Sequence, residues 1–207
     1  MENLKIFKHP LLEDHLAIIR NKTTQGPSFR KSIEEISRLL FYEASRDLLL
    51  QSKKISTPMA PTSVLVIKDE IVLIPILRAG LGMERSILKA VPFAKVGHIG
   101  IKRDEETKIS KVYYVNLPHD LSKTKVFLLD PMLASGGSAT LAIDLLIANH
   151  AKDITYIGII GCDQGVNKLL NHYPLLKIIL AAKDPILNDK SFLVPGLGDC
   201  GDRYFGE

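Results

Sequence analysis

The sequence predicts an α/β protein whose mostly parallel central sheet is flanked by helices. The short, fully apolar run at residues 126–129 is typical of a strand buried on both faces of a parallel sheet, and residues 154–160 predict another buried strand. Segments with apolar residues at helical spacing lie between such runs, and this alternation is typical of α/β folds. The chain has 207 residues, the size of one domain, so we expect a single domain over residues 1–207.

The first third of the chain is predicted to begin with helices and then to change its period. Residues 11–20 and 28–50 have apolar side chains at helical spacing, and Pro27 lies near the start of the second segment, where a missing N–H costs nothing. Residues 62–67 and 71–77 are rich in β-forming residues and are separated by a short polar turn, so they predict two strands.

The remaining elements alternate along the chain. Strands are expected at 95–102 and 111–117, joined by the densely charged loop 103–110, and together they form a β-hairpin arm. The pattern also predicts helices at 79–91, 139–149 and 164–171, a strand at 176–182, and mostly loop over 184–207. Ligands of such a sheet bind beyond the carboxyl ends of its strands, which directs attention to the residues that follow them.

Composition excludes several classes of protein. Hydrophobic residues make up 46% and charged residues 24%, which is the balance of a globular chain rather than a disordered one. No run reaches 18 apolar residues, and the N-terminus lacks a signal-peptide pattern. Cys162 and Cys200 have no metal-site spacing, so we expect a reducing, cytoplasmic location. The net charge of +4 fits either a polyanionic small ligand or simple solubility.

The segment after the apolar strand 126–129 has the chemistry of a phosphate site. Asp130 follows the strand, and the run Ser135-Gly136-Gly137-Ser138 leads into a helix. Glycines let backbone N–H groups approach an anion, the helix N-terminus adds partial positive charge, and the serines add hydroxyl donors. Asp130 is suited to sugar hydroxyls. The alternative, a plain strand–turn–helix connection with a capping serine, is about equally compatible with these residues alone.

A second glycine pattern is rejected on geometry. Residues 196–201 match G-x-G-x-x-G, the dinucleotide-binding fingerprint. That fingerprint opens a helix and requires an acidic residue about 20 positions later. Only residues 202–207 follow, so the sequence leaves room for neither.

Four segments together resemble the uracil phosphoribosyltransferases. DPMLASGGS (130–138) is similar to that family's motif for 5-phosphoribosyl 1-diphosphate (PRPP), and IPILRAGLGM (74–83) to its diphosphate loop. The segment 96–118 resembles its catalytic hairpin, and VPGLGDCGDRYFG (194–206) its uracil-binding C-terminus. The resemblance covers residues 6–206. It implies a phosphoribosyltransferase fold with a base-binding hood formed by N-terminal and C-terminal segments.

The resemblance implies an enzyme of pyrimidine salvage that converts uracil and PRPP to UMP and diphosphate. Arg78 would bind the leaving diphosphate, after a cis Leu77–Arg78 peptide. Arg103, in the mobile loop, and Asp199 would be catalytic and would also contact PRPP. The remaining PRPP-binding residues would be Asp130, Pro131, Met132, Leu133, Ala134, Ser135, Gly136, Gly137 and Ser138, and uracil would be read by Leu193, Gly198, Asp199 and Cys200.

The resemblance also implies a cofactor and partners. Because Asp130 is the only acid where many related enzymes have two, Mg²⁺ is expected to be held by PRPP and water, with no direct protein ligand. Family members form homodimers or higher homo-oligomers, and some respond to GTP, which makes GTP a candidate effector. Ser135 replaces a commoner threonine, Cys200 a commoner alanine, and the difference at Glu207 is expected to have no catalytic effect.

Two other functions are compatible with parts of the sequence. One is a regulatory RNA-binding protein with the same fold, but the chain shows no arginine-rich face or aromatic platform for RNA. The other is an enzyme for a different base such as hypoxanthine, against which the GLGDCGD segment argues. Neither nucleic acid nor a membrane is therefore expected as a partner.

Overall fold

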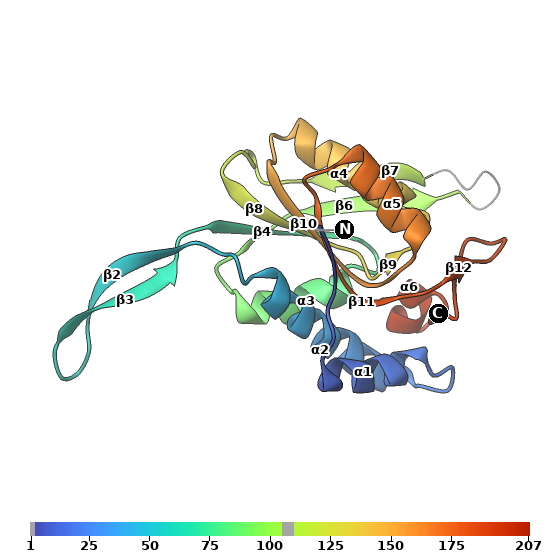
Figure 1. The fold of residues 1–207 in the computed structure, drawn as a ribbon, viewed down its shortest axis with the longest axis horizontal. Helices are drawn as coiled ribbons and strands as arrows, with labels where there is room; N and C mark the ends of the chain where they lie inside the picture. Colours follow the sequence, from blue (N-terminus) through green and yellow to red (C-terminus); the bar gives the residue numbers. More distant parts are fainter. Residues whose placement is uncertain (1–2, 105–109) are drawn as a thin grey trace.

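The computed structural model describes residues 3–104 and 110–207, without the side chain of Arg103, and it has the predicted α/β architecture (Figure 1). Within these residues the main sheet has the strand order β1-β11-β10-β8-β4-β6-β7. The bounds of these strands are β1 Leu4–Ile6, β4 Glu70–Leu77, β6 His98–Arg103, β7 Ser110–Asn116, β8 Thr124–Leu129, β10 Asp153–Gly161 and β11 Lys177–Lys183. The short strands β5 (Lys95–Val96) and β9 (Met132–Leu133) pair with β4 and β10.

The sheet is parallel except at one edge. β4, β8, β10, β11 and β1 run parallel, as do β4 and β6, whereas β7 pairs antiparallel with β6. This confirms both the mostly parallel sheet and the hairpin between 95 and 117. The carboxyl ends of β4, β8 and β10 therefore lie side by side at one edge of the sheet, which is where ligands of such folds bind.

Helices cover both faces of the sheet (Figure 1). One face carries α1 (Pro10–Arg20), α2 (Gly26–Ala44) and α3 (Leu81–Ala90), and the other carries α4 (Gly137–Ala148) and α5 (Asp163–His172). Alternate residues of each strand pack against the helices on opposite faces of the sheet, because successive side chains of a strand point to opposite faces. Phe127 packs with α1–α3, whereas its neighbours Val126 and Leu128 pack with α4 and α5.

The predicted helix over 28–50 is wrong in its last turns. α2 ends at Ala44, and Leu50–Ser56 is instead a strand, β2, paired antiparallel with β3 (Pro61–Ile67). This hairpin projects away from the rest of the chain (Figure 1). All seven residues of β2 are exposed, so no buried face imposes an alternating pattern on the sequence, and the strand left no clear signal.

The expectation of mostly loop beyond residue 184 is also only partly right. Two short strands, β12 (Ile186–Leu187) and β13 (Leu193–Val194), pair antiparallel, and α6 (Cys200–Phe205) follows them. Asp199 caps α6 by accepting from Asp202 N at 2.9 Å. Helices this short depend on tertiary packing, here the burial of Tyr204 against the place where α3 has Gly82, so local periodicity could not reveal them.

No helix in the described part of the chain combines the length and the apolar character needed to cross a membrane.

Replacing Phe127 by Ala should strongly destabilise the fold. Phe127 is fully buried and packs edge-to-face on Phe41 of α2, with ring centroids 5.1 Å apart. We expect a loss of ~3–5 kcal/mol in the free energy of unfolding, measured by denaturant titration. Phe93→Ala is the matched control, because Phe93 is 60% exposed and its removal should cost less than ~0.5 kcal/mol. Equal effects of the two changes would contradict the assigned core.

Candidate active site

Asp130 lies directly after β8 and is fixed by its neighbour strand β10. Its N–H donates to Ile157 O at 3.2 Å, and its carbonyl accepts from the hydroxyl of the fully buried Tyr156 at 3.0 Å. Burial raises the pKa of the Asp130 carboxyl to about 7, although a hydrogen bond from Met132 N acts in the opposite direction. The carboxyl is thus poised between its neutral and ionised forms near neutral pH.

The segment 134–138 forms a backbone cradle ahead of α4. Gly136 has φ +76° and is the N-cap residue of α4, which begins at Gly137, two residues earlier than predicted. The Cys162 thiol donates to Ala134 O, with Sγ at 3.3 Å from it. Gly165 of α5 packs so closely on the same oxygen that a Cβ there would lie 2.3 Å from it. The conformation of the cradle therefore depends both on the positive φ that Gly136 permits and on the packing of Cys162 and Gly165 against Ala134.

This cradle lines a hollow of about 80 Å³. Ser110, at the start of β7, also reaches it, with its hydroxyl 3.4 Å from that of Ser138. The backbone N–H groups at the start of α4 and the two hydroxyls are suited to an anion. The lining residues are Ser110, Asp130, Met132, Leu133, Ala134, Ser135, Gly136, Gly137, Ser138 and Ala139.

A second hollow, of about 220 Å³, adjoins the first. The two share Asp130, Met132 and Ala134, so a ligand that fills both passes over the Asp130 carboxyl. Its other walls come from the turn after β4 and from the C-terminal segment. The lining is Ala79, Asp130, Met132, Ala134, Ser191, Phe192, Leu193, Gly198, Asp199, Cys200 and Gly201.

The C-terminal wall of this hollow combines the glycines Gly198 and Gly201 with Cys200 and one carboxylate, that of Asp199. Gly198 has φ +82°, a conformation that favours glycine. Cys200 is buried, and burial raises the pKa of its thiol well above the ordinary value, so the thiol is neutral. The Asp199 carboxyl is partly engaged in capping α6.

Arg78 lies at the carboxyl end of β4 but is turned toward the C-terminus. Its guanidinium pairs with both carboxylate oxygens of Glu207, at 2.5 and 3.1 Å, and lies 3.6 Å from Asp202. This contact raises the pKa of Arg78 and lowers the pKa of Glu207. Arg78 is half exposed and borders a separate hollow of about 410 Å³ beside the hairpin residues Lys102 and Tyr113. The Leu77–Arg78 peptide is cis, as the resemblance implies.

The structure thus brings together most of the residues singled out in the sequence. Pro131 is buried beside the hollows without lining them, and its carbonyl accepts from Ile159 N and Ile160 N. The backbone of Arg103 ends β6, but its side chain and residues 105–109 lie outside the described part of the chain.

Several site residues escaped the sequence analysis. Ala79, Ser110, Ser191 and Phe192 line the hollows, although none was proposed as a site residue. Ala79 is adjacent to Arg78, and Ser110 ends the charged loop, so position along the chain was a usable signal for both. Phe192 is adjacent to Leu193, so the same signal applied to it, whereas Ser191 is brought to the hollow by the return of the chain after β12.

Among the described residues, no three His, Cys, Asp or Glu side chains gather in a way that could hold a metal ion. Asp130 and Asp199 are the carboxylates that line the second hollow. Oxygen donors of this kind fit a hydrated Mg²⁺ carried by a phosphorylated ligand, because Mg²⁺ retains several waters when it binds.

The fold and this site define the chain as a phosphoribosyltransferase in architecture. Adenine phosphoribosyltransferase from Trypanosoma brucei is 13% identical with a TM-score of 0.60, and the match covers 92% of this chain and 88% of that one, a likeness of fold alone. A solved structure of a protein from Aquifex aeolicus is far more similar, with 36% identity and a TM-score of 0.94 over 98% of this chain and 97% of that one.

Sequence comparison identifies the family. Residues 6–207 match the family model described as "Uracil phosphoribosyltransferase". The uracil phosphoribosyltransferase of Levilactobacillus brevis is 46% identical over 100% of this chain and 99% of its own length, and that of Acholeplasma laidlawii is 44% identical over 100% and 99%. The chain belongs to the uracil phosphoribosyltransferase family.

Replacing Gly80 by Ala should displace the turn that carries Arg78 and Ala79. A methyl group there would lie 2.5 Å from Leu129 O and 2.7 Å from Ile76 O, and backbone oxygens cannot rotate away as a side chain can. We expect a loss of ~1–3 kcal/mol in the free energy of unfolding, measured by denaturant titration.

The matched control for this change is Gly26→Ala, at the first residue of α2. There the nearest group is the flexible end of Arg30, at 3.2 Å, so stability should be unchanged or slightly higher. If Gly80→Ala were as stable as the control, the close packing of the β4 turn on β8 would be refuted.

Proposed function

We propose that the chain transfers the 5-phosphoribosyl group of PRPP to uracil, forming UMP and diphosphate. Membership in the uracil phosphoribosyltransferase family supports this reaction. The observation that carries it for this chain is the pair of adjoining hollows that share Asp130, one suited to an anion and the other lined by the glycine-containing C-terminal segment. Such a pair can seat an activated sugar phosphate and a neutral base side by side.

The first hollow is the proposed seat of the 5′-phosphate and ribose. The backbone and hydroxyls of residues 134–138 would bind the phosphate, because the glycines and the start of α4 direct N–H groups toward an anion. Asp130, in its ionised form, would accept hydrogen bonds from the ribose hydroxyls. Pro131, Met132 and Leu133 would connect and shape this seat.

The second hollow is the proposed seat of uracil. Main-chain groups of Leu193, Gly198, Asp199 and Cys200 would pair with the two carbonyls and the N3–H of the base. Cytosine would place an amino group where uracil has a carbonyl, facing a backbone N–H. Leaving such buried donors unpaired gives discrimination on the order of 10⁴-fold.

The reaction breaks the bond between the ribose anomeric carbon and diphosphate and forms the bond to uracil N1. Arg78 and Arg103 are proposed to stabilise the negative charge that grows on diphosphate, since guanidinium groups bind phosphate oxygens in a two-point fashion. The turn after β4 and the hairpin β6–β7 place these two arginines on neighbouring segments. Asp199 is proposed to help orient PRPP relative to the base.

Mg²⁺ is the proposed cofactor, held by PRPP and water near Asp130 and Asp199. When bound, it supplies charge neutralisation to the diphosphate. We further propose that the whole chain acts as one catalytic domain, as a homodimer or higher homo-oligomer in the cytoplasm, with GTP as a candidate effector. The two cysteines are buried and unpaired in the described structure, which is compatible with a reducing compartment.

The proposal is tested with purified protein, PRPP, Mg²⁺ and single bases, with UMP measured by chromatography. UMP should form with uracil, and no nucleotide should form with cytosine, hypoxanthine or adenine. Turnover of a purine base instead would replace the uracil assignment. Tight binding of a structured RNA without any turnover would favour a regulatory role and would overturn the proposal.

The affinity for PRPP should rise with pH around neutrality. The Asp130 carboxyl has a pKa of about 7 in the free protein and must be ionised to accept from ribose hydroxyls, so PRPP should bind more weakly at pH 6 than at pH 8. Calorimetric titration with PRPP and Mg²⁺ measures this.

Asp130→Asn is the control for that titration, because the phosphates of PRPP themselves titrate near pH 6. The variant should bind PRPP more weakly at pH 8 and should lose the part of the pH dependence that Asp130 contributes. Identical pH profiles for the two proteins would remove Asp130 from ribose binding.

Glu207 should weaken binding of diphosphate, although from the sequence it is expected to have no catalytic effect. Its carboxylate occupies both Nη atoms of Arg78, which are the donors proposed for diphosphate. Since the pair is exposed, Glu207→Gln should lower the inhibition constant of diphosphate by only ~2–5-fold. Product-inhibition kinetics measure this, and an unchanged or higher constant would show that the contact does not compete.

A further inference from the structure

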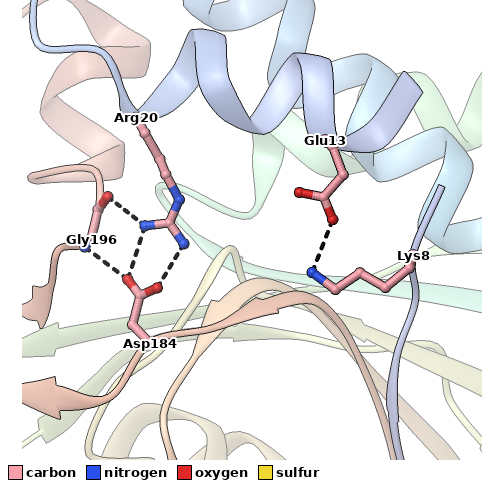
Figure 2. A network of polar contacts seen from close by, with 5 residues as sticks. All are labelled: Lys8, Glu13, Arg20, Asp184 and Gly196. Atoms are coloured by element: carbon pink, nitrogen blue, oxygen red, sulfur yellow. Dashed lines mark hydrogen bonds and ion pairs between the residues drawn. The ribbon is translucent and has the colours of Figure 1, made fainter. Parts of the chain in front are cut away.

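An ion pair between the partly exposed Arg20 and the buried Asp184 joins the end of α1 to the chain just before β12 (Figure 2). Arg20, the last residue of α1, donates from Nη1 to Asp184 Oδ2 at 3.0 Å and from Nη2 to Asp184 Oδ1 at 2.6 Å. Asp184 is 3% exposed. A two-point pair of this kind fixes the relative orientation of its partners as well as their distance.

Both side chains of this pair also hold Gly196. The N–H of Gly196 donates to Asp184 Oδ2 at 2.7 Å, and its carbonyl accepts from Arg20 Nη1 at 2.9 Å (Figure 2). Gly196 has φ +59°, and a Cβ there would lie 2.1 Å from Leu193 O, so no other residue fits this turn. One residue thus has both of its main-chain groups fixed by side chains from distant parts of the sequence.

The next carbonyl is fixed to the same end of α1 by a second arginine. Arg203 donates from Nη1 to Leu197 O at 2.6 Å and to Ile19 O at 2.5 Å, and from Nη2 to Asn21 O at 2.8 Å. Its guanidinium also lies over the Phe29 ring, 4.3 Å from the centroid. The carbonyls of residues 196 and 197 are therefore both tied to the N-terminal helices.

These contacts lie behind the proposed uracil seat rather than in it. Gly196 and Leu197 are buried and line neither of the two hollows that share Asp130, whereas Gly198, Asp199 and Cys200, which follow directly, line the second one. Arg20 and Asp184 line neither hollow as well. Their effect on a base in that hollow can be exerted only through the position of the loop 193–200.

We propose that Arg20 and Asp184 are positioning residues for base recognition, which hold residues 196–200 where their main-chain groups can read uracil. This inference rests on the proposed function, because it assumes that uracil binds in the second hollow beside residues 198–200. Main-chain recognition requires placement within about 0.5 Å, and a backbone wall cannot adjust by changing rotamer. Residues 195–200 have no strand partner, since the pairing of β13 ends at Val194. The contacts of Arg20, Asp184 and Arg203 with residues 196 and 197 therefore hold this loop in place.

The proposal predicts different effects on the binding of the two substrates. The phosphate cradle is held by different groups, namely Tyr156, Cys162 and Gly165, none of which forms a hydrogen bond with the side chain of Arg20 or Asp184 in the described structure. Loosening the loop should therefore weaken uracil binding and its discrimination from cytosine, and should leave PRPP binding nearly unchanged. A residue needed only for folding would lower the amount of active enzyme without changing either KM.

The test is steady-state kinetics of Arg20→Gln with uracil, cytosine and PRPP. Hydrogen bonds to charged groups contribute enough that we expect the KM for uracil to rise at least ~10-fold. The KM for PRPP should stay within ~2-fold, and the preference for uracil over cytosine in kcat/KM should fall. Arg20→Lys, which keeps the charge but not the two-point geometry, should give intermediate values for uracil.

Glu13→Gln is the matched control. Glu13 lies on the same helix α1 and forms an exposed ion pair with Lys8 at 2.9 Å, which touches neither Asp184 nor Gly196 (Figure 2). Its loss should change none of the kinetic constants. If Arg20→Gln does not fold, Arg20→Lys and Asp184→Asn undergo the same measurements and decide the question.

Two outcomes would overturn the proposal. One is a folded Arg20 variant whose KM for uracil and whose uracil preference equal those of the wild type. The other is a parallel rise of both KM values. Failure of the proposed function can be told apart from failure of this inference, because the wild-type protein would then form no UMP at all. In that case the position of Gly196 is tested without turnover, by hydrogen exchange at its N–H group. Arg20→Gln should accelerate this exchange, and Glu13→Gln should leave it unchanged.

Discussion

The hydrogen-bonded parallel pairing of β4, β8 and β10 is the constraint on which the rest of the structure depends. It brings the carboxyl ends of three strands to one edge, so that Arg78 follows one strand, Asp130 the next and Cys162 the third. Close packing at Gly80 holds the turn after β4 against β8. Without this register, the cradle before α4 and the turn before α3 would not face a common ligand.

Two different kinds of support hold the two halves of the site. The phosphate cradle inherits its position from the sheet, through hydrogen bonds from β10 and packing on α5. The C-terminal wall lies beyond the sheet, and its backbone groups need other partners, since buried main-chain polar groups are costly when unpaired. Arg20, Asp184 and Arg203 supply those partners and thereby join the two ends of the chain over the site.

The electrostatics of the ligand-free site follow from the same arrangement. Arg78 is satisfied by Glu207, and Asp130 has a pKa of about 7 because it is withdrawn from water. The Arg78 guanidinium is thus already paired within the chain, and the Asp130 carboxyl is partly protonated near neutral pH. A ligand with a negative diphosphate and donor hydroxyls, bound as proposed, would replace these internal contacts with its own, so its binding is expected to depend on pH and on the C-terminal residue.

The sequence by itself determined the parallel α/β fold, because buried strands and amphipathic helices leave a local pattern, and it singled out residues 134–138 as a candidate phosphate site, because these residues are contiguous. Strand β2, and with it the hairpin that it forms with the predicted strand β3, was missed because no buried face imposes a pattern on β2, and α6 was missed because a helix this short forms only by packing. Only the tertiary structure decided that Ser191 lines the second hollow, that Glu207 covers Arg78, and that Arg20 meets Asp184 across 164 positions. Contacts between distant segments leave no local periodicity, so folding alone brings them together.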